Sequence, residues 1–327
     1  MALPHDQGVS VTYYVDTDSL TGKNLTRSNQ NEFMMLGFSN HQELKVPLFF
    51  LFLLIYLFTV LSNFFIIGLI SIDSHLQKPM YFFICNMSFI DIGYSTVTTP
   101  NLLQLVFNGI KRISFGGCMT QLYFFNSFGS LEYMLLTSMA YDRYVAICHP
   151  LSYHLVMNRE TCLCLALTAW GMGFIAAFPL SVLISSLCFC SSIEINHFFC
   201  DLTPLLAIAC DDTTTTQYVL YTEGVLFVLS CFLLTLISYI YIISAILKIS
   251  SRDGRYKAFS TCASHLNIVV LFYLMIACMY MKPTSSYSLD EGKGLSVLYV
   301  IIIPMLNPII YSLRNNDVKE AFMRLTK

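Results

Sequence analysis

Charged residues are scarce in this chain of 327 residues: they make up 12% of it, where a soluble domain carries about a quarter. The formal net charge is −2, which excludes a broad basic surface for nucleic acid. Hydrophobic residues make up 56% of the sequence. So much apolar surface must face lipid as well as protein, and the composition therefore favours an integral membrane protein with lipid as a partner.

Signatures of several other classes are also missing. The first 45 residues are polar, so we expect no cleaved signal peptide, and the first hydrophobic helix must act as its own insertion signal. The Cys-X-Cys pairs at 162–164 and 188–190 lack zinc spacing, and no phosphate loop or nucleophile motif is present, which argues against an enzyme. Internal repeats with paired broken helices, typical of secondary transporters, are not found either.

Seven apolar stretches are each long enough to cross a bilayer, which takes about 20 helical residues. They are expected near 47–71, 80–104, 118–141, 161–184, 217–248, 258–281 and 294–312. Most connections are short, so neighbouring helices should run antiparallel; the loop over 185–216 is the long exception. The expected fold is an all-α membrane protein, a seven-transmembrane helix bundle between an N-terminal tail, 1–46, and a C-terminal segment, 313–327.

The basic residues between the spans predict the orientation. With the N-terminus outside, the inner segments hold eleven Lys and Arg residues and the outer segments seven, a moderate bias that follows the positive-inside rule. Asn24-Leu25-Thr26 is a glycosylation sequon in the outer tail, which agrees. We therefore expect a plasma-membrane protein with an extracellular N-terminus and a cytoplasmic C-terminus.

Five cysteines gather at the outer end of the expected bundle. Cys118 begins the third span, and Cys188, Cys190, Cys200 and Cys210 lie in the long loop. Disulfides are permitted on this side, which is oxidising during maturation. A bond from Cys118 to the loop would fold the loop as a lid over the bundle. Sequence alone does not fix the connectivity among five candidates, and free thiols are the alternative.

Two carboxyl groups, Asp91 and Glu132, lie within the spans, each roughly 16 Å from the inner membrane face at about 1.5 Å per residue. Asn63 and Asn307 come out at roughly 10–14 Å, so four helices contribute polar groups to one layer. Charges inside a membrane are costly and mark functional sites by default. Two close carboxylates repel unless one is protonated or a cation lies between them. We expect a sodium ion or a shared proton at Asp91 and Glu132; a structural network with waters is the alternative.

The third span ends in Asp142-Arg143-Tyr144. Arg143 is always charged and presents a rigid fork of donors. It must therefore pair with Asp142, with a neighbouring helix or with the backbone of a partner, which makes it a natural two-state element. An ordinary arginine that extends its head to the membrane surface is the alternative.

The seventh span contains two prolines, Pro304 and Pro308, and a proline removes a backbone donor and kinks a helix. Asn307 can satisfy the freed groups, and Tyr311 then faces the bundle from a mobile position. The segment 312–327 mixes apolar and basic residues, which favours a short amphipathic helix on the inner membrane surface; a frayed tail is the alternative.

Longer strings of the sequence resemble known receptors. Asp142-Arg143-Tyr144 and the string from Asn307 to Tyr311 resemble the rhodopsin-like (class A) G protein-coupled receptors. The chain is similar to the odorant (olfactory) receptors in particular, through five strings in order: PMYFF at 79–83, MAYDRYVAICHP at 139–150, HFFCD at 197–201, KAFSTCASHL at 257–266 and PMLNPIIYSLRN at 304–315. The resemblance covers roughly 31–324, and it fails at Ser62 and Leu274, where the family commonly has glycine.

The resemblance implies several assignments. Two disulfides are implied, Cys118–Cys200 and Cys190–Cys210. Asp91 and Glu132 match the acidic pair that the family carries in the membrane. Arg143 and its flanks should engage a stimulatory heterotrimeric G protein that raises cyclic AMP. The residues expected to serve coupling and activation are Asp142, Arg143, Tyr144, Asn307, Pro308 and Tyr311.

Odorants are small and largely apolar, and a concave apolar pocket with few polar groups suits them. By resemblance, the pocket lies between two helical faces in the outer half of the bundle: Phe125, Asn126, Gly129 and Ser130 on the third span, and Tyr273, Ile276, Ala277 and Tyr280 on the sixth. Ordinary helix packing is the alternative for each residue. Phe125 occupies the place where amine receptors of the wider family carry an aspartate, so a cationic amine ligand is not expected.

The expected function is that of an odorant receptor without a cofactor, apart from the sodium ion considered above. A chemoreceptor for a non-odorant small molecule outside olfactory tissue would have the same fold. A secondary transporter is the main rival from another class.

Overall fold

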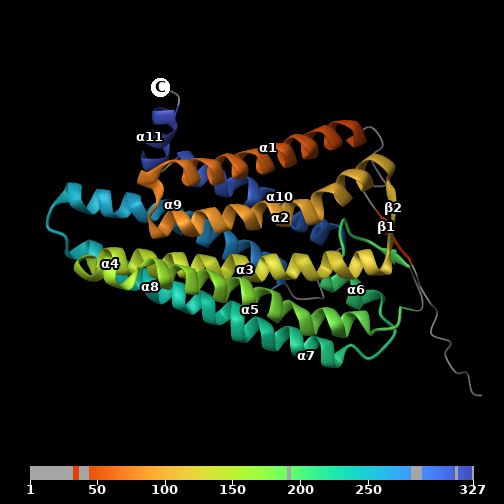
Figure 1. The fold of residues 1–327 in the computed structure, drawn as a ribbon. Coiled ribbons are helices and arrows are strands. Elements are labelled where there is room, and N and C mark those ends of the chain that lie inside the picture. The colour runs from red at the N-terminus through yellow and green to blue at the C-terminus, as the bar shows by residue number, and fades with distance from the viewer. Residues whose placement is uncertain (1–31, 37–43, 190–192, 281–288, 314–315, 326–327) are drawn as a thin grey trace, which may run out of the picture.

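The computed structural model describes residues 32–36, 44–189, 193–280, 289–313 and 316–325 (Figure 1). Within these residues, seven long helical segments run side by side. They are α1 (Lys45–Ile72), α2 (Pro79–Asn108), α3 (Phe115–Cys148), α5 (Arg159–Ser185), a continuous helix made of α7 (Thr214–Glu223), the wider turns of η4 (Gly224–Leu229) and α8 (Ser230–Lys248), then α9 (Arg252–Tyr280) and α10 (Leu289–Leu313). Each contains one of the stretches expected from the sequence, in α9 as far as residue 280.

Local signals explain where several helices begin and end. Pro79 occupies the first turn of α2, where its missing N–H costs nothing. Gly109, with a positive φ of 80°, ends that helix in a conformation that favours glycine. The hydroxyl of Ser114 accepts a hydrogen bond from the Gly117 N–H at 3.1 Å and starts α3, and Asn158 does the same for Thr161 at 2.8 Å in α5.

By length and hydropathy, three of the described helical segments qualify individually as membrane spans: α1, α5 and the continuous helix over 214–248. A fourth, α9, qualifies when its two parts, Arg252–Ser260 and Cys262–Cys278, which meet at 46°, are taken together. The described part of α10 contains a shorter apolar stretch, Ser296–Tyr311. The helices α2, α3 and α10 carry the buried polar groups Asp91, Glu132 and Asn307.

A small three-stranded sheet closes one end of the bundle, with the order β2-β1-β3. Its strands are β1 (Glu32–Leu36), β2 (Ile110–Ser114) and β3 (Glu194–Ile195); β1 runs antiparallel to β2 and parallel to β3. Phe33 and Met35 of β1 are buried, and the Phe33 ring lies 5.2 Å from that of Phe189. Part of the predicted polar tail 1–46 therefore packs as a strand. We call the end that carries this sheet the outer end and the opposite end the inner end.

The inner end carries the expected short helix, α11 (Asn316–Leu325), which lies across the direction of the long helices (Figure 1). It buries Val318 and Ala321 and exposes Phe322 and Met323. Two ion pairs hold it to the turn after α1. Arg324 pairs with Asp73 at 2.8 Å, and Lys78 pairs with Asp317 at 2.8 Å. Hydrogen bonds from Arg324 and Lys78 hold the pKa values of Asp73 and Asp317 below their ordinary range.

Candidate functional site

The four predicted residues of α3 lie in the outer half of the bundle. Phe125 is buried, and its ring lies between those of Tyr94 on α2 and Phe199 in the outer loop. The side-chain nitrogen of Asn126 is buried and finds no hydrogen-bond partner in the described part of the chain. A Cβ placed on Gly129 would meet no neighbouring atom within 4 Å, so there is open space beside α3 at this level. Ser130 follows in a partly buried position.

The predicted residues of α9 form the second face. The Tyr273 ring packs edge-on against Phe232 of α8, with centroids 4.9 Å apart. Ile276 and Ala277 are partly buried one turn further along the helix. Tyr280 ends the helix, and its side chain lies outside the described residues.

A run of aromatic rings joins the two predicted faces, and sequence reasoning missed most of it. It begins in the outer loop, passes through α3, α2, α10 and α9, and ends on α8. The successive centroid distances are 4.7 Å for Phe199–Phe125, 4.9 Å for Phe125–Tyr94, 6.0 Å for Tyr94–Tyr299, 6.4 Å for Tyr299–Phe272, 5.4 Å for Phe272–Tyr273 and 4.9 Å for Tyr273–Phe232. These spacings suit favourable aromatic pairs.

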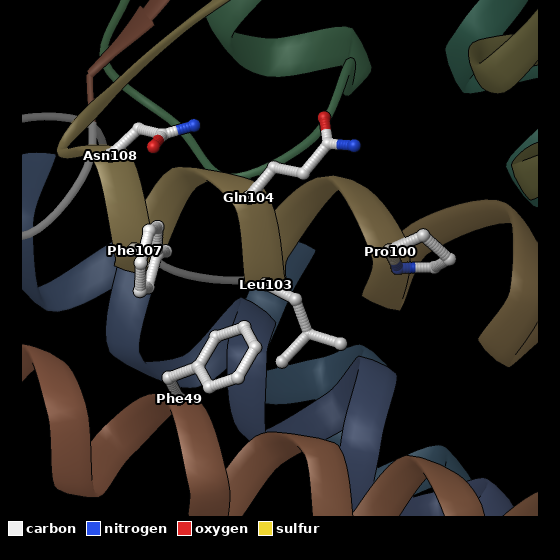
Figure 2. A pocket seen from close by; sticks show the side chains of 6 residues that line it. All are labelled: Phe49, Pro100, Leu103, Gln104, Phe107 and Asn108. Atoms are coloured by element: carbon white, nitrogen blue, oxygen red, sulfur yellow. The ribbon is translucent and has the colours of Figure 1, made fainter.

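Two hollows on the outside of the bundle do not coincide with these faces. One, of about 360 Å³, lies between α1 and α2, where Phe49 faces Leu103 and Phe107 (Figure 2). The other, of about 460 Å³, lies along the inner part of α5 beside Leu163 and Leu167. The surfaces of both hollows are mainly apolar, although Gln104 and Asn108 also line the first and Glu160 and Thr168 the second. Neither hollow contains any of the ligand residues predicted from the sequence.

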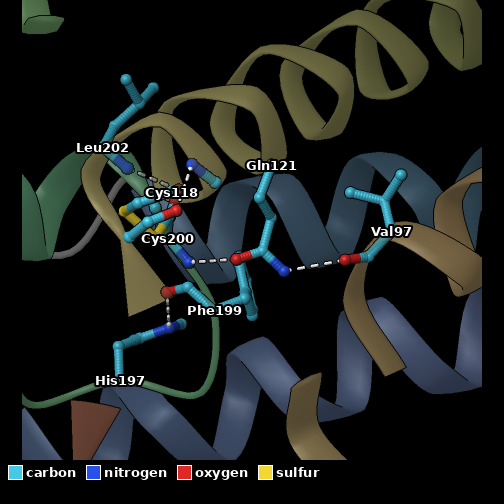
Figure 3. The surroundings of a disulfide bond; sticks show 10 residues. Val97, Cys118, Gln121, His197, Phe199, Cys200 and Leu202 are labelled. Atoms are coloured by element: carbon cyan, nitrogen blue, oxygen red, sulfur yellow. Dashed lines mark hydrogen bonds between the residues drawn. A yellow bond between two sulfur atoms is a disulfide. The ribbon is translucent and has the colours of Figure 1, made fainter. Parts of the chain in front are cut away.

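The outer loop closes over the bundle as a lid, which we define as residues 197–201. Cys200 forms a disulfide with Cys118 at the start of α3, with the two Cα atoms 5.4 Å apart (Figure 3). All five side chains of the lid are buried, including the polar His197 and Asp201. Burial raises the pKa of Asp201 to about 6. The lid is thus part of the interior, although the sequence places it in a polar loop.

Two other assignments at the outer end lie wholly or partly outside the described residues. Cys190 lies outside the described residues, so its disulfide with Cys210 stays a prediction. The Cys210 N–H donates to the carbonyl of Cys188 at 2.9 Å, which brings these two segments of the loop together. Asn24 also lies outside the described residues, and its glycosylation stays a prediction.

The four polar residues expected to share one layer are all buried, with at most 3% of each exposed. The Asn307 amide donates to Asp91 at 2.9 Å. Glu132 of α3 lies within interaction range of both. Asn63 of α1 joins the group through α10, where its amide donates to the Pro304 carbonyl at 3.4 Å.

One oxygen of each of these four side chains is buried and accepts no hydrogen bond from the described part of the chain. The oxygens are Asn63 Oδ1, Asp91 Oδ2, Glu132 Oε1 and Asn307 Oδ1. A buried oxygen without a donor is costly, and an all-oxygen set is the type that hard cations bind. A proton on one carboxyl group would relieve the same cost. Among the described residues, no group of three or more His, Cys, Asp and Glu side chains forms a metal site.

The backbone carbonyl of α10 that loses its helical donor is not hydrogen-bonded by Asn307, contrary to what we expected from the sequence. Pro308 has no N–H, so the Pro304 carbonyl lacks its helical donor. Asn63, from α1, supplies the donor instead, while Asn307 turns to Asp91. Sequence reasoning assigned the task to the nearest polar residue because it could not know how α1 and α10 are rotated toward each other.

At the inner end of α3, Arg143 forms an ion pair with the fully buried Asp142 at 3.1 Å. Asp142 also accepts a hydrogen bond from Tyr153 of α4 (Tyr153–Val156) at 2.8 Å. Tyr144 shares a hydrogen bond with His149 at 3.1 Å, and the buried Tyr311 hydroxyl lies 3.9 Å from the Met139 sulfur. Arg143 is thus held by a residue of its own helix, and its side chain is only 14% exposed.

A buried hydrogen bond joins α8 to α9 near Arg143. The Tyr239 hydroxyl shares a hydrogen bond of 2.6 Å with Nδ1 of the buried His265.

Just beyond the inner end of α3, Leu151 in the turn η3 (Pro150–Ser152) is fully exposed, and Leu155 of α4 is 79% exposed. Large apolar side chains with this exposure are available to a partner.

The sequence model of the olfactory receptors matches residues 52–327. The chain belongs to the olfactory receptor family. It is 48% identical to olfactory receptor 5AR1 of Mus musculus over 90% of this chain and 95% of the relative, and 49% identical to olfactory receptor 8I2 of Homo sapiens over 94% and 98%. The fold resembles the crystal structure of squid rhodopsin, with a TM-score of 0.68 at 16% identity over 86% of this chain and 80% of that one.

As an olfactory receptor, the protein is a multi-pass membrane protein and a G protein-coupled receptor rather than an enzyme. Its sequence contains no direct signal for Tyr299. Phe199 belongs to the string HFFCD, which marks the family resemblance but does not show that its ring meets Phe125. Gln121 was missed although a signal existed: it is a polar residue inside a span, one helical turn below Cys118. In the folded chain its side chain bonds to α2 and to the lid.

Proposed function

We propose that this olfactory receptor binds a small, mostly apolar odorant between α3 and α9 in the outer half of the bundle. The aromatic run that links Phe125 to Tyr273 is the observation that supports this site. The open space beside Gly129 gives the ligand room, and the unpaired Asn126 nitrogen offers one polar contact. Such a site is apolar with few polar groups, as small-ligand pockets are.

The inner end is proposed to couple to a stimulatory, olfactory-type heterotrimeric G protein that raises cyclic AMP. The N-terminus is then extracellular and the C-terminus cytoplasmic, as the distribution of Lys and Arg predicts. Arg143 supports this role because its pair with Asp142 is a contact within α3 that it can exchange for a partner's carbonyl groups. The exposed Leu151 adds an apolar contact for the same partner.

Activation is proposed to be a shift between two arrangements of the bundle. A ligand moves such an equilibrium only by the difference between its affinities for the two states. A change from 1:99 to 99:1 needs a difference of about 5.5 kcal/mol. In the active arrangement, the inner ends of α3, α9 and α10 would part, which exposes Arg143 to the G protein.

The ligand site is tested with Gly129→Leu in cells that carry a cyclic AMP reporter and are screened against a varied odorant panel. The new side chain enters open space, so the receptor should reach the cell surface but lose its response. Gly171→Leu is the matched control, because a Cβ on Gly171 in α5 also meets nothing within 4 Å. An unchanged odorant response in Gly129→Leu would contradict the proposed site.

The coupling role is tested separately with Arg143→Ala. This variant should keep its surface expression and lose signalling, because it lacks the cation that exchanges partners. Preserved signalling would refute the role of Arg143 even if the ligand site stands.

The acidic layer is proposed to hold a sodium ion or a shared proton, with Asn63, Asp91, Glu132 and Asn307 as the oxygen donors. Their four unpaired oxygens support this proposal. When bound, a cation would stabilise two close carboxylates in one arrangement of the bundle. Replacing external sodium by choline should change signalling of the intact receptor, and Asp91→Asn should abolish that effect. A receptor that is insensitive to sodium would contradict the sodium ion and leave a shared proton or a structural network with waters.

Two other functions have distinct tests. A chemoreceptor for a non-odorant molecule would be expressed outside olfactory tissue and respond to compounds from that tissue instead of the odorant panel. A transporter would accumulate a labelled solute in vesicles that contain the purified chain.

A further inference from the structure

Gln121 lies on the face of α3 between the disulfide and the proposed pocket, and its side chain is only 5% exposed. Cys118 is three residues before it and Phe125 four residues after it, so all three share one side of the helix. A buried amide needs partners for its N–H and C=O groups, and those partners tell what it holds together.

The amide of Gln121 joins three segments of the chain (Figure 3). Its nitrogen donates to the Val97 carbonyl of α2 at 2.7 Å, and its oxygen accepts from the Cys200 N–H of the lid at 3.0 Å. Val97 lies three residues before Pro100, a proline inside α2 that has no N–H to donate to the helix. The two partners also fix the orientation of the amide, because a carbonyl must receive a donor and an N–H must meet an acceptor.

The second attachment matters because a disulfide alone fixes the lid at a single point. The lid segment could still turn about that bond. The hydrogen bond to Cys200 lies one helical turn deeper and sets the direction in which the neighbouring Phe199 points. Phe199 is buried, and its ring lies 4.7 Å from that of Phe125, a residue of the proposed pocket.

We propose that Gln121 is a positioning residue for odorant binding: it holds the lid so that Phe199 forms the roof of the pocket over Phe125. The inference rests on the proposed ligand site. It explains why the residue is glutamine, since glutamate in its charged form cannot donate to Val97, methionine offers neither group, and asparagine is one carbon shorter.

The test compares Gln121→Glu and Gln121→Met with the wild type in the reporter assay, using any odorant that activates the wild type. At pH 7.5 both variants should need about ten times more odorant for a half-maximal response, about 1.4 kcal/mol of affinity, and keep their maximal response. At an external pH of 5.5 the introduced glutamate side chain, once protonated, can again donate to Val97 and accept from Cys200. The shift of Gln121→Glu, taken relative to wild type at the same pH, should therefore shrink, while that of Gln121→Met should not.

His197 and Asp201, the other titratable groups of the lid, are present in all three proteins and cancel in these ratios. Gln217→Glu is the matched control. Gln217 is exposed near the outer end of α7, and its side-chain nitrogen donates to the hydroxyl of Thr213, the residue before that helix, at 3.0 Å. This variant should respond like the wild type at both pH values.

Hydrogen exchange of purified receptor tests the positioning without any odorant. The backbone amides of 197–202 should exchange at least ten times faster in Gln121→Met than in wild type, while those of α5 should be unchanged. Unchanged exchange of the lid would overturn the proposal. Faster exchange with an unchanged half-maximal concentration would overturn it too, because the contact would then be merely structural. If the wild type responds to no odorant, the proposed function is contradicted instead. The hydrogen-exchange result then still tests whether Gln121 positions the lid.

Discussion

The hydrogen bond from Asn63 to the Pro304 carbonyl makes a prediction about two residues on different helices. Asn63→Leu removes the donor while roughly keeping the shape of the side chain. In the wild-type background the buried Pro304 carbonyl then loses this donor and has no helical N–H in its place, because residue 308 is a proline. In a Pro308→Ala background the N–H of the introduced alanine can supply the missing helical hydrogen bond. Loss of Asn63 should therefore cost less stability in that background.

The size of the difference follows from the geometry. A buried backbone carbonyl without a partner costs about 1–3 kcal/mol. The Asn63 nitrogen lies 3.4 Å from the Pro304 oxygen, at the long end of the range for a hydrogen bond, so the lower limit applies. We expect a coupling energy of about 1 kcal/mol between the two substitutions. The second bond of Asn63, to the Thr59 carbonyl at 3.0 Å, is lost in both backgrounds and cancels.

The measurement is the unfolding rate of the four purified receptors in detergent at one fixed temperature, since irreversible unfolding is judged best by its rate. A matched cycle combines Asn86→Leu with Pro308→Ala. Asn86 accepts a hydrogen bond from Trp170 of α5 at 3.0 Å, and no hydrogen bond joins it to α10 in the described part of the chain, so this second cycle should be additive. If the Asn63 cycle is also additive within about 0.3 kcal/mol, Asn63 does not replace the helical donor and the reasoning fails.

Three further predictions concern packing, pH and coupling. Gly173→Ala should be less stable than Gly171→Ala by about 1–3 kcal/mol in thermal unfolding, since its Cβ would lie 2.7 Å from Leu131 of α3 whereas Gly171 faces open space; equal stabilities would refute the clash. Burial raises the pKa of Asp201 to about 6, above its unfolded value of about 3.9. The stability that protonated Asp201 gives the lid is therefore full below about pH 4 and is lost as the pH rises through about 6. Hydrogen exchange of the lid, corrected for its intrinsic pH dependence, should slow on acidification, and Asp201→Asn should remove that effect. Leu151→Ser should leave surface expression unchanged, because the side chain is fully exposed, and should weaken G protein recruitment in a proximity assay; undiminished recruitment would exclude Leu151 from the interface.

The long helices could be predicted because apolar length is a property of each segment alone. The strand β1 could not, since its sequence, Glu32 to Leu36, has four apolar residues in succession and no alternation of polar and apolar positions. Its burial depends on β2 and β3, which belong to loops far away in the sequence. The inner end of α3 runs to Cys148, seven residues past the expected span, because a helix can continue beyond the apolar stretch that crosses the membrane.

For the site as well, a residue could be predicted when its own segment marks it and not when its role depends on packing between distant segments. Asp91 and Glu132 were identifiable because a carboxyl group in an apolar span is costly whatever surrounds it. Tyr299 was not, because an aromatic residue in such a span is ordinary, and only the rotation of α10 decides whether its ring meets Tyr94 or lipid. Gln121 falls between these cases: its polarity marks it, whereas its partners on α2 and on the lid depend on the folded chain.

The aromatic run and the acidic layer are built on the same faces of the same helices. On α2, Tyr94 lies three residues after Asp91; on α3, Phe125 lies seven residues before Glu132; on α10, Tyr299 lies eight residues before Asn307. Spacings of three, seven and eight place both members of each pair on one side of a helix. Three helices therefore each present a ring to the proposed ligand and a polar group to the layer beneath. A helix moves as a rigid body over one or two turns, so a rotation that changes the contact between Phe125 and Tyr94 also displaces Glu132 relative to Asp91. In the proposed activation, the ligand therefore needs no direct contact with the acidic layer to alter the hydrogen bond between Asn307 and Asp91. We propose that bond as the two-state element that such coupling requires.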